Sequence, residues 1–256
     1  MSNFHRHTRR LPKRLLLIGL LLSAPGWALA QPFLEGAAVE RLRESMVYLS
    51  GLEEFALDTQ TSIEVVLLSG QKIQLDNGAS VVVRRPDKMY AAKRGELVDQ
   101  EFFYDGETLT LADGPTGYHA TVEAPGTLEG MLDFARESLD IVAPAGDFIY
   151  ANAFEILMQD VYSGFVVGTA AVSGTACDHL AFSAPGTDWQ IWIQRGDKPL
   201  PRKIVITSRD VVNAPQFTVS IDEWDLSPDT SDDRFRFEPS ESSQHIGFTR
   251  LDAGSQ

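Results

Sequence analysis

Cysteine and histidine are scarce in this sequence, and their scarcity argues against several kinds of site. Cys177 is the only cysteine among 256 residues, so no intramolecular disulfide can form and the fold depends on its core. The histidines lack metal-ligand spacing, and the aspartates between residues 225 and 233 do not match a calcium-binding EF-hand loop. We therefore expect no metal site and no cofactor.

Catalytic motifs are missing as well. The sequence contains no G-x-S-x-G nucleophile elbow and no glycine-rich phosphate loop. Cys177 and His179 share one face of an expected strand, but a catalytic pair usually comes from separate elements and needs a third, orienting group. We interpret them as a buried thiol beside a half-buried imidazole, expect no catalytic residue, and keep a hydrolase only as a remote alternative.

The apolar run Leu15 to Leu22 is too short to span a membrane. It follows a basic start and precedes Ala28-Leu29-Ala30, which together are typical of a secretory signal peptide. We expect residues 1–30 to be cleaved after Ala30, and we favour ordinary secretion over the twin-arginine route that Arg9-Arg10 suggests. Because Gln31 and not a cysteine stands directly after the cleavage site, we expect a periplasmic protein without a lipid anchor.

Basic residues are few once this segment is set aside. The first thirty residues hold five of the 22 Lys and Arg residues and none of the 36 Asp and Glu residues, so the remainder carries a formal charge of −19. Such a surface repels nucleic acid and keeps a protein soluble, and it can also recruit a basic partner. We expect no nucleic-acid partner and a monomer.

The first half of the remaining chain predicts one helix and a meander of strands. Apolar residues recur at helical spacing from Glu35 to Leu49, and short alternating strands follow up to about residue 121. We expect Asp76-Asn77-Gly78 to form a hairpin turn between two of these strands, because Asn-Gly tolerates positive φ angles.

Helices are expected in the middle of the chain. Thr127 can cap a helix with an apolar stripe that runs from Leu128 to Leu139, and Asp147 can cap a second helix that runs to Val161. The second helix is apolar on more than one side, which suits a helix that covers a cavity.

Strands return in the last part of the chain. The run from Thr187 to Thr207 reads as strand, turn and strand, and its first strand has large side chains on both faces, including Trp189 and Trp192. Five strands are expected between Phe165 and Trp224, then a short strand Phe235-Arg236-Phe237, and residues 240–256 should form a polar flexible tail.

The order of strands, helices and more strands predicts an α+β fold that is mainly β. We expect one domain, residues 31–239, in which a single highly curved antiparallel sheet forms an incomplete barrel and helices pack in its concave face as a lid. Such an arrangement can hold an apolar cavity between sheet and helices.

The hairpin at residues 187–207, with the segments Cys177 to Phe182 before it and Phe217 to Trp224 after it, resembles the matching part of the bacterial lipoprotein-carrier (LolA-like) superfamily. The resemblance covers most of the chain after the signal peptide and is strongest to the uncharacterised periplasmic members. It implies a half-barrel closed by a helical lid, with a cavity for acyl chains. The longer helical region and the missing basic docking patch depart from the dedicated lipoprotein chaperone.

These observations lead to a hypothesis of a soluble periplasmic carrier that holds an acyl chain, a lipid or a lipoprotein. Hydrocarbon burial at about 25 cal/mol per Å² can reach micromolar affinity without specific polar contacts. The alternative is a protein-interaction or sensor module with a filled core, which would bind a periplasmic or membrane-bound protein. The candidate cavity lining consists of apolar residues of the expected strands and of the second mid-chain helix: Ile63, Val65, Leu67, Phe148, Phe154, Leu157, Trp189, Ile191, Ile193, Ile204, Ile206, Phe217, Val219 and Ile221.

Overall fold

The computed structural model describes residues 33–141 and 146–248. Within these residues the strands form one twelve-stranded sheet in the order β12-β6-β5-β4-β3-β2-β1-β11-β10-β9-β8-β7. Neighbouring strands pair antiparallel, except that β12 runs parallel to β6. The expected signal peptide and its cleavage site lie outside the described residues.

Helical segments interrupt the chain before β1, between β6 and β7, and after β11. The helical segments are α1 (Gly36–Ser50), α2 (Leu128–Leu139), α3 (Ala153–Met158) and the 3-10 turns η1 (Gly146–Ile149) and η2 (Asp232–Phe235). The strands of the first half are β1 (Glu54–Val66), β2 (Lys72–Arg84), β3 (Lys88–Gly95), β4 (Asp99–Tyr104), β5 (Thr108–Asp113) and β6 (Tyr118–Glu123). Those of the second half are β7 (Ser163–Val172), β8 (Thr175–Ala184), β9 (Thr187–Gln194), β10 (Pro201–Ser208), β11 (Gln216–Asp225) and β12 (Gln244–His245).

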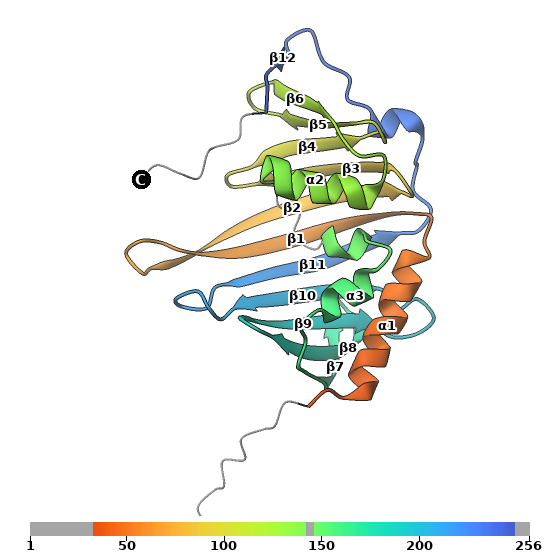
Figure 1. Cartoon of the computed structure of the whole chain (residues 1–256), viewed down its shortest axis with the longest axis vertical. Helices are drawn as coiled ribbons and strands as arrows, with labels where there is room; N and C mark the ends of the chain where they lie inside the picture. Colours follow the sequence, from red (N-terminus) through yellow and green to blue (C-terminus); the bar gives the residue numbers. More distant parts are fainter. Residues whose placement is uncertain (1–32, 142–145, 249–256) are drawn as a thin grey trace, which may run out of the picture. The chain divides into compact units, whose positions relative to one another are not determined.

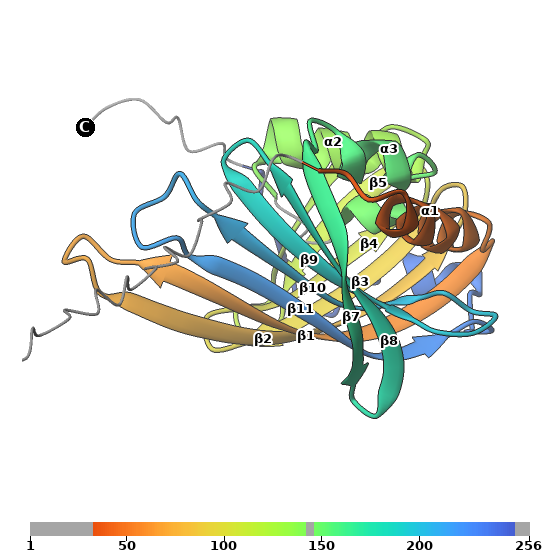
Figure 2. The same cartoon turned by 90° about the horizontal axis from the view of Figure 1, so that it is seen from below.

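The sheet is curved and open, and α1, α2 and α3 all lie over one of its faces (Figures 1 and 2). Its two edges, β7 and β12, are the ends of the strand order and do not pair with each other. The predicted fold class, a curved antiparallel sheet that forms an incomplete barrel under a layer of helices, is therefore confirmed.

Two sequence patterns explain why the elements stack in this way. Helix α1 buries the stripe expected of it, with Ala38, Leu42, Met46 and Leu49 at most 1 % exposed. Strand β9 alternates as predicted, because Trp189, Ile191 and Ile193 are buried while the residues between them are half-buried. Arg41 of α1 fixes the helix to the sheet by donating a hydrogen bond to the carbonyl of Gln194 at 2.7 Å.

The predicted hairpin turn at Asp76-Asn77-Gly78 is wrong. These residues lie inside β2, where Asn77 pairs with Thr61 of β1, and the chain reverses instead around Gly70, which has a φ of +81°. Asn-Gly is tolerated in the strand because Gly95 of β3 faces Asn77. A Cβ atom at position 95 would lie 2.5 Å from the Asn77 Cβ, so only glycine leaves room for this pair.

Two further predictions of secondary structure are wrong. The single helix expected from Asp147 to Val161 is divided into η1 and α3, and the expected terminal strand at 235–237 is replaced by η2 and extended chain. Phe235 is fully buried on the convex face of the sheet against Val82 and Ala92, so tertiary packing fixes this segment outside the ladder. Within the expected tail, Gln244 and His245 form β12 on the edge of the sheet.

Candidate ligand cavity

The concave face of the sheet encloses space under the helices. An outer chamber of about 690 Å³ lies between β2–β5 on one side and α2 and η1 on the other, a volume in the range of small-molecule sites. An inner chamber of about 140 Å³ continues it toward β1, β11 and α1. The two chambers share several lining residues, Ala79, Val81, Met89, Ala91, Lys93, Leu132 and Gly146, so they adjoin.

The floor of the outer chamber is mainly apolar, and each strand contributes alternate residues to it. From β3 these residues are Met89, Ala91 and Lys93, and from β4 they are Gln100 and Phe102. Helix α2 supplies the opposite wall with Met131, Leu132, Ala135 and Arg136. The lining thus combines an extensive apolar surface with a few polar groups, which is the usual composition of a small-molecule pocket.

The outer chamber reaches the surface near the C-terminal end of α2. Arg136 and Asp140, both exposed, belong to its lining. Arg136 donates hydrogen bonds to Asp133 at 2.6 Å and to the Tyr150 hydroxyl at 3.0 Å. Burial, the hydrogen bond to Asp133 and the nearby carboxylates raise the pKa of Tyr150 to about 12, although the Arg136 charge opposes this shift. The hydroxyl therefore stays protonated at neutral pH and can donate to Asp133 at 2.8 Å.

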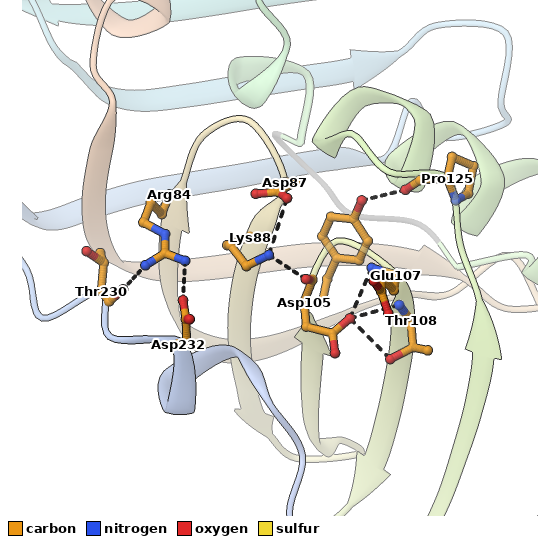
Figure 3. Close-up of polar contacts among 10 residues, drawn as sticks. Arg84, Asp87, Lys88, Asp105, Glu107, Thr108, Pro125, Thr230 and Asp232 are labelled. Carbon is orange, nitrogen blue, oxygen red and sulfur yellow. Dashed lines mark hydrogen bonds and ion pairs between the residues drawn. The ribbon is translucent and has the colours of Figure 1, made fainter.

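The N-terminal end of α2 is anchored by hydrogen bonds to other parts of the chain. The Tyr104 hydroxyl donates to the Pro125 carbonyl, and the Leu128 amide donates to the Pro86 carbonyl at 2.9 Å. Figure 3 shows the surrounding polar contacts, in which Lys88 bridges Asp87 and the Asp105 carbonyl. Burial and neighbouring carboxylates raise the pKa of Tyr104 to about 12, so this anchor keeps its proton at neutral pH.

A second set of contacts in the same view joins the sheet to residues 230–232, at the start of η2. Arg84 donates to the Thr230 carbonyl at 2.6 Å and contacts Asp232, and the Asp105 carboxylate accepts from the Thr108 amide at 2.8 Å (Figure 3). These bonds fix the ends of β2 and the β4–β5 hairpin. The strands that form the cavity floor are therefore held at their ends by these contacts.

The structure distributes the fourteen candidate lining residues over three environments. Ile206 and Phe217 line the outer chamber, and Phe148, Val219 and Ile221 line the inner chamber. Trp189, Ile191, Ile193 and Ile204 are buried in packed core and belong to the lining of neither chamber.

The remaining candidates also lie outside the lining of the two chambers. Phe154 and Leu157 are partly buried against the core, and the Arg43 guanidinium stacks 3.9 Å from the centre of the Phe154 ring. Ile63 and Val65 are half-buried on β1, and Leu67 is 41 % exposed in the turn that follows.

Sequence reasoning missed most of the cavity floor. The missed residues are small or flexible apolar side chains at alternate positions of β2–β5, namely Ala79, Val81, Met89, Ala91, Phe102, Leu109 and Leu111. The alanines at inward positions of adjacent strands were the available signal, because small side chains under a helix leave space. That signal depends on strand register, which the wrong turn at Asn77-Gly78 obscured.

Cys177 and His179 lie on the side of the sheet away from the helices. Cys177 is fully buried, and burial raises the pKa of its thiol, which disfavours the nucleophilic thiolate. His179 shares a hydrogen bond with the Gln190 side chain at 3.0 Å and stacks on Trp192. Asp178 points to the opposite face, where it forms an ion pair with Arg41 at 2.9 Å.

Among residues 33–141 and 146–248, no group of three or more His, Cys, Asp and Glu side chains is arranged to hold a metal ion. No helix in the same part of the chain combines the length and apolar character needed to cross a membrane. The cavity is therefore the feature of the described residues with the clearest capacity to bind a ligand.

The fold and the chambers define a class of protein, an open half-barrel with a helix-covered apolar cavity. The chain belongs to the DUF2092 family of predicted periplasmic proteins, whose family model matches residues 38–249. The prediction of an uncharacterised periplasmic family is thereby confirmed. No curated protein matches the chain.

Several solved structures are similar to this chain at low sequence identity. LprF from Mycobacterium bovis is 14 % identical with a TM-score of 0.47, and the match covers 76 % of this chain and 95 % of LprF. An uncharacterised conserved protein from Thermus thermophilus is 11 % identical with a TM-score of 0.48, with 82 % and 99 % of the two chains covered. A LolA superfamily protein from Nitrosomonas europaea is 10 % identical with a TM-score of 0.39, with 78 % and 97 % covered.

Proposed function

We propose that this protein is a periplasmic binding or carrier protein that shields the apolar part of a lipid, an acyl chain or a lipidated protein in its two adjoining chambers. The proposal is that it acts without catalysis, as a soluble monomer released from its signal peptide after Ala30. The observation that carries it is the outer chamber of about 690 Å³, whose floor and roof are formed mainly by apolar side chains.

The physical argument rests on the cost of leaving apolar surface in water. Burial of hydrocarbon contributes about 25 cal/mol per Å², so an acyl chain that fills an apolar cavity gains free energy without any directional contact. A cavity of this size lined by Val81, Ala91 and Phe102 offers such burial. The anchored N-terminal end and the exposed C-terminal end of α2 suggest that ligand enters beside Arg136 and Asp140.

The first test is native mass spectrometry of the chain from residue 31, purified from a bacterial periplasm and then incubated with palmitate. We expect a co-purifying mass of lipid size, or a palmitate adduct that forms on incubation. A ligand-free mass in both experiments contradicts the carrier proposal and favours the alternative of an interaction module.

A matched pair of variants then locates the site. Ala91→Leu places a larger side chain in both chambers, and we expect it to weaken palmitate binding at least tenfold because it occupies the ligand's volume. Ala171→Leu makes the same change at an exposed position of β7 and should leave binding unchanged. Equal effects of the two changes would mean that the ligand binds elsewhere.

A further inference from the structure

Polar side chains cross the cavity floor on four adjacent strands. They are Thr61 on β1, Asn77 on β2, Lys93 on β3 and Gln100 on β4, and each lines at least one chamber. Thr61 pairs directly with Asn77, and Lys93 pairs directly with Gln100. We call these four residues the polar row.

The strand register brings the two pairs of the polar row together. Asn77 pairs with Gly95, and Lys93 stands two residues before Gly95 on the same face of β3, so Asn77 and Lys93 are diagonal neighbours. Gly95 has no side chain, so that position adds no group beside Asn77. The polar row therefore forms one continuous strip rather than four unrelated positions.

The side chains of the polar row lack polar partners among the described residues. No hydrogen bond or ion pair joins the Thr61 hydroxyl, the Asn77 amide, the Lys93 ammonium or the Gln100 amide to another group in residues 33–141 and 146–248. Thr61 and Asn77 are each only 8 % exposed. The polar atoms of the row are not fully enclosed by protein, so they open onto the chambers and can hydrogen-bond to a polar group that enters with the ligand.

The charges around the chambers indicate which charge the ligand group that contacts the polar row should carry. Arg136 on the helix side is neutralised, because Asp133 lies 2.6 Å and Asp147 lies 3.8 Å from its guanidinium. Asp140 is an exposed carboxylate at the mouth. Lys93 is the cation of the sheet side, and no carboxylate among the described residues lies within ion-pair distance of it. Its ammonium has three donors and no acceptor, and the neighbouring amides and hydroxyl can also donate.

We propose that the protein binds an amphiphile with a negatively charged head group, a carboxylate or a phosphate. In this arrangement the ammonium of Lys93 pairs with the head group, Gln100 and Asn77 donate hydrogen bonds to it, and the hydrocarbon chain lies in the chambers. The inference rests on the proposed function and deepens it by naming the ligand class. An anionic head group supplies the acceptors that the polar row lacks.

The experiment compares three amphiphiles of equal chain length with the protein from residue 31: palmitate, the corresponding alcohol and the corresponding trimethylammonium compound. Isothermal titration is carried out on the wild type, on Lys93→Met and on Lys203→Met. Lys203 is the control lysine, because it lines neither chamber and its ammonium lies 5.0 Å from the Trp192 ring.

We expect palmitate to bind the wild type more tightly than the alcohol and to lose about tenfold in affinity in Lys93→Met, since a charge-assisted contact is removed. Affinity for the alcohol should not change in Lys93→Met, and Lys203→Met should match the wild type for all three compounds. Free acetate and inorganic phosphate should not compete with palmitate, because neither carries a chain.

Each other result has a distinct meaning. If palmitate and the alcohol bind equally and Lys93→Met affects neither, the head-group site is wrong while the carrier function stands. Stronger binding of the cationic amphiphile also overturns the inference and points to Asp140. If no amphiphile binds the wild type, the proposed function itself fails. Should Lys93→Met not fold, Lys93→Gln removes the charge while keeping a polar side chain.

Discussion

The two halves of the sheet carry helices on the same face, yet one half is filled and the other is hollow. Over β8 and β9 the space is occupied by side chains such as Leu180, Ile191 and Ile193, none of which is measurably exposed. Two adjoining chambers remain elsewhere, the outer one over β2 to β5 under α2 and the inner one toward β1 and β11.

The difference follows from the size of the inward side chains. In the filled half the Phe182 and Trp189 rings stack with centroids 4.3 Å apart, and they belong to the same core cluster as the buried stripe of α1. In the hollow half the corresponding positions include Ala79 and Ala91, and the helix contributes Ala135. The same strand alternation therefore builds a core in one half and a cavity in the other, which separates the part that stabilises the fold from the part that can bind.

The largest expected effect comes from truncating the filled half. Ile191→Ala should lower the free energy of unfolding by about 2–5 kcal/mol, because it removes buried methyl groups and leaves a void in packed core. Ile206→Ala makes the same change at a side chain that already faces the outer chamber, and should lose less than half as much. Urea unfolding measures both, and equal losses would show that the chamber is closed and packed in solution.

The next effect compares two neighbouring alanines of β3. Ala92 packs on the convex face against Val82, Tyr90 and Phe235, so Ala92→Leu should overpack this cluster and cost about 1–3 kcal/mol. Ala91 faces the chambers, and Ala91→Leu should change stability by less than about 1 kcal/mol while it weakens ligand binding. Thermal and urea unfolding of both variants test this, and a reversed order contradicts the assignment of the faces.

A smaller effect concerns the roof of the hollow half. The Thr127 hydroxyl caps α2 by accepting a hydrogen bond from the Gly130 amide at 3.1 Å, so Thr127→Ala should cost about 1 kcal/mol. Thr127→Ser keeps the hydroxyl and should lose much less. Urea unfolding distinguishes them, and equal losses would mean that the cap does not hold the helix.

The smallest effect is that of the ionisation of Tyr104, which changes stability only in alkali. Its pKa is raised from an ordinary value of 10.0 to about 12 in the folded protein, chiefly by burial. The folded state then holds the proton more tightly than the unfolded state, so this contribution is complete below pH 10 and is lost as the pH rises toward 12. Tyrosinate absorbance should show one late-titrating group fewer in Tyr104→Phe, and an unchanged titration would contradict the buried anchor.

Local sequence signals predicted much of the fold. The stripe of α1, the cap at Thr127 and the alternation of β9 were all read correctly, because each depends on residues within a few positions of one another. The break between η1 and α3, the burial of Phe235 and the pairing of β12 were not, since distant segments determine them. The same limit applies to the cavity: the sequence indicated inward apolar residues, but not which of them would face open space.

The sequence by itself determined an acidic, mainly β chain with helices in mid-chain, through composition, periodicity and a helix cap. Only the tertiary structure decided where the cavity lies and which residues line it. The position of Lys93 beside Asn77 and Gln100 depends on the register of three strands, and register is set by long-range pairing rather than by the residues next to each position.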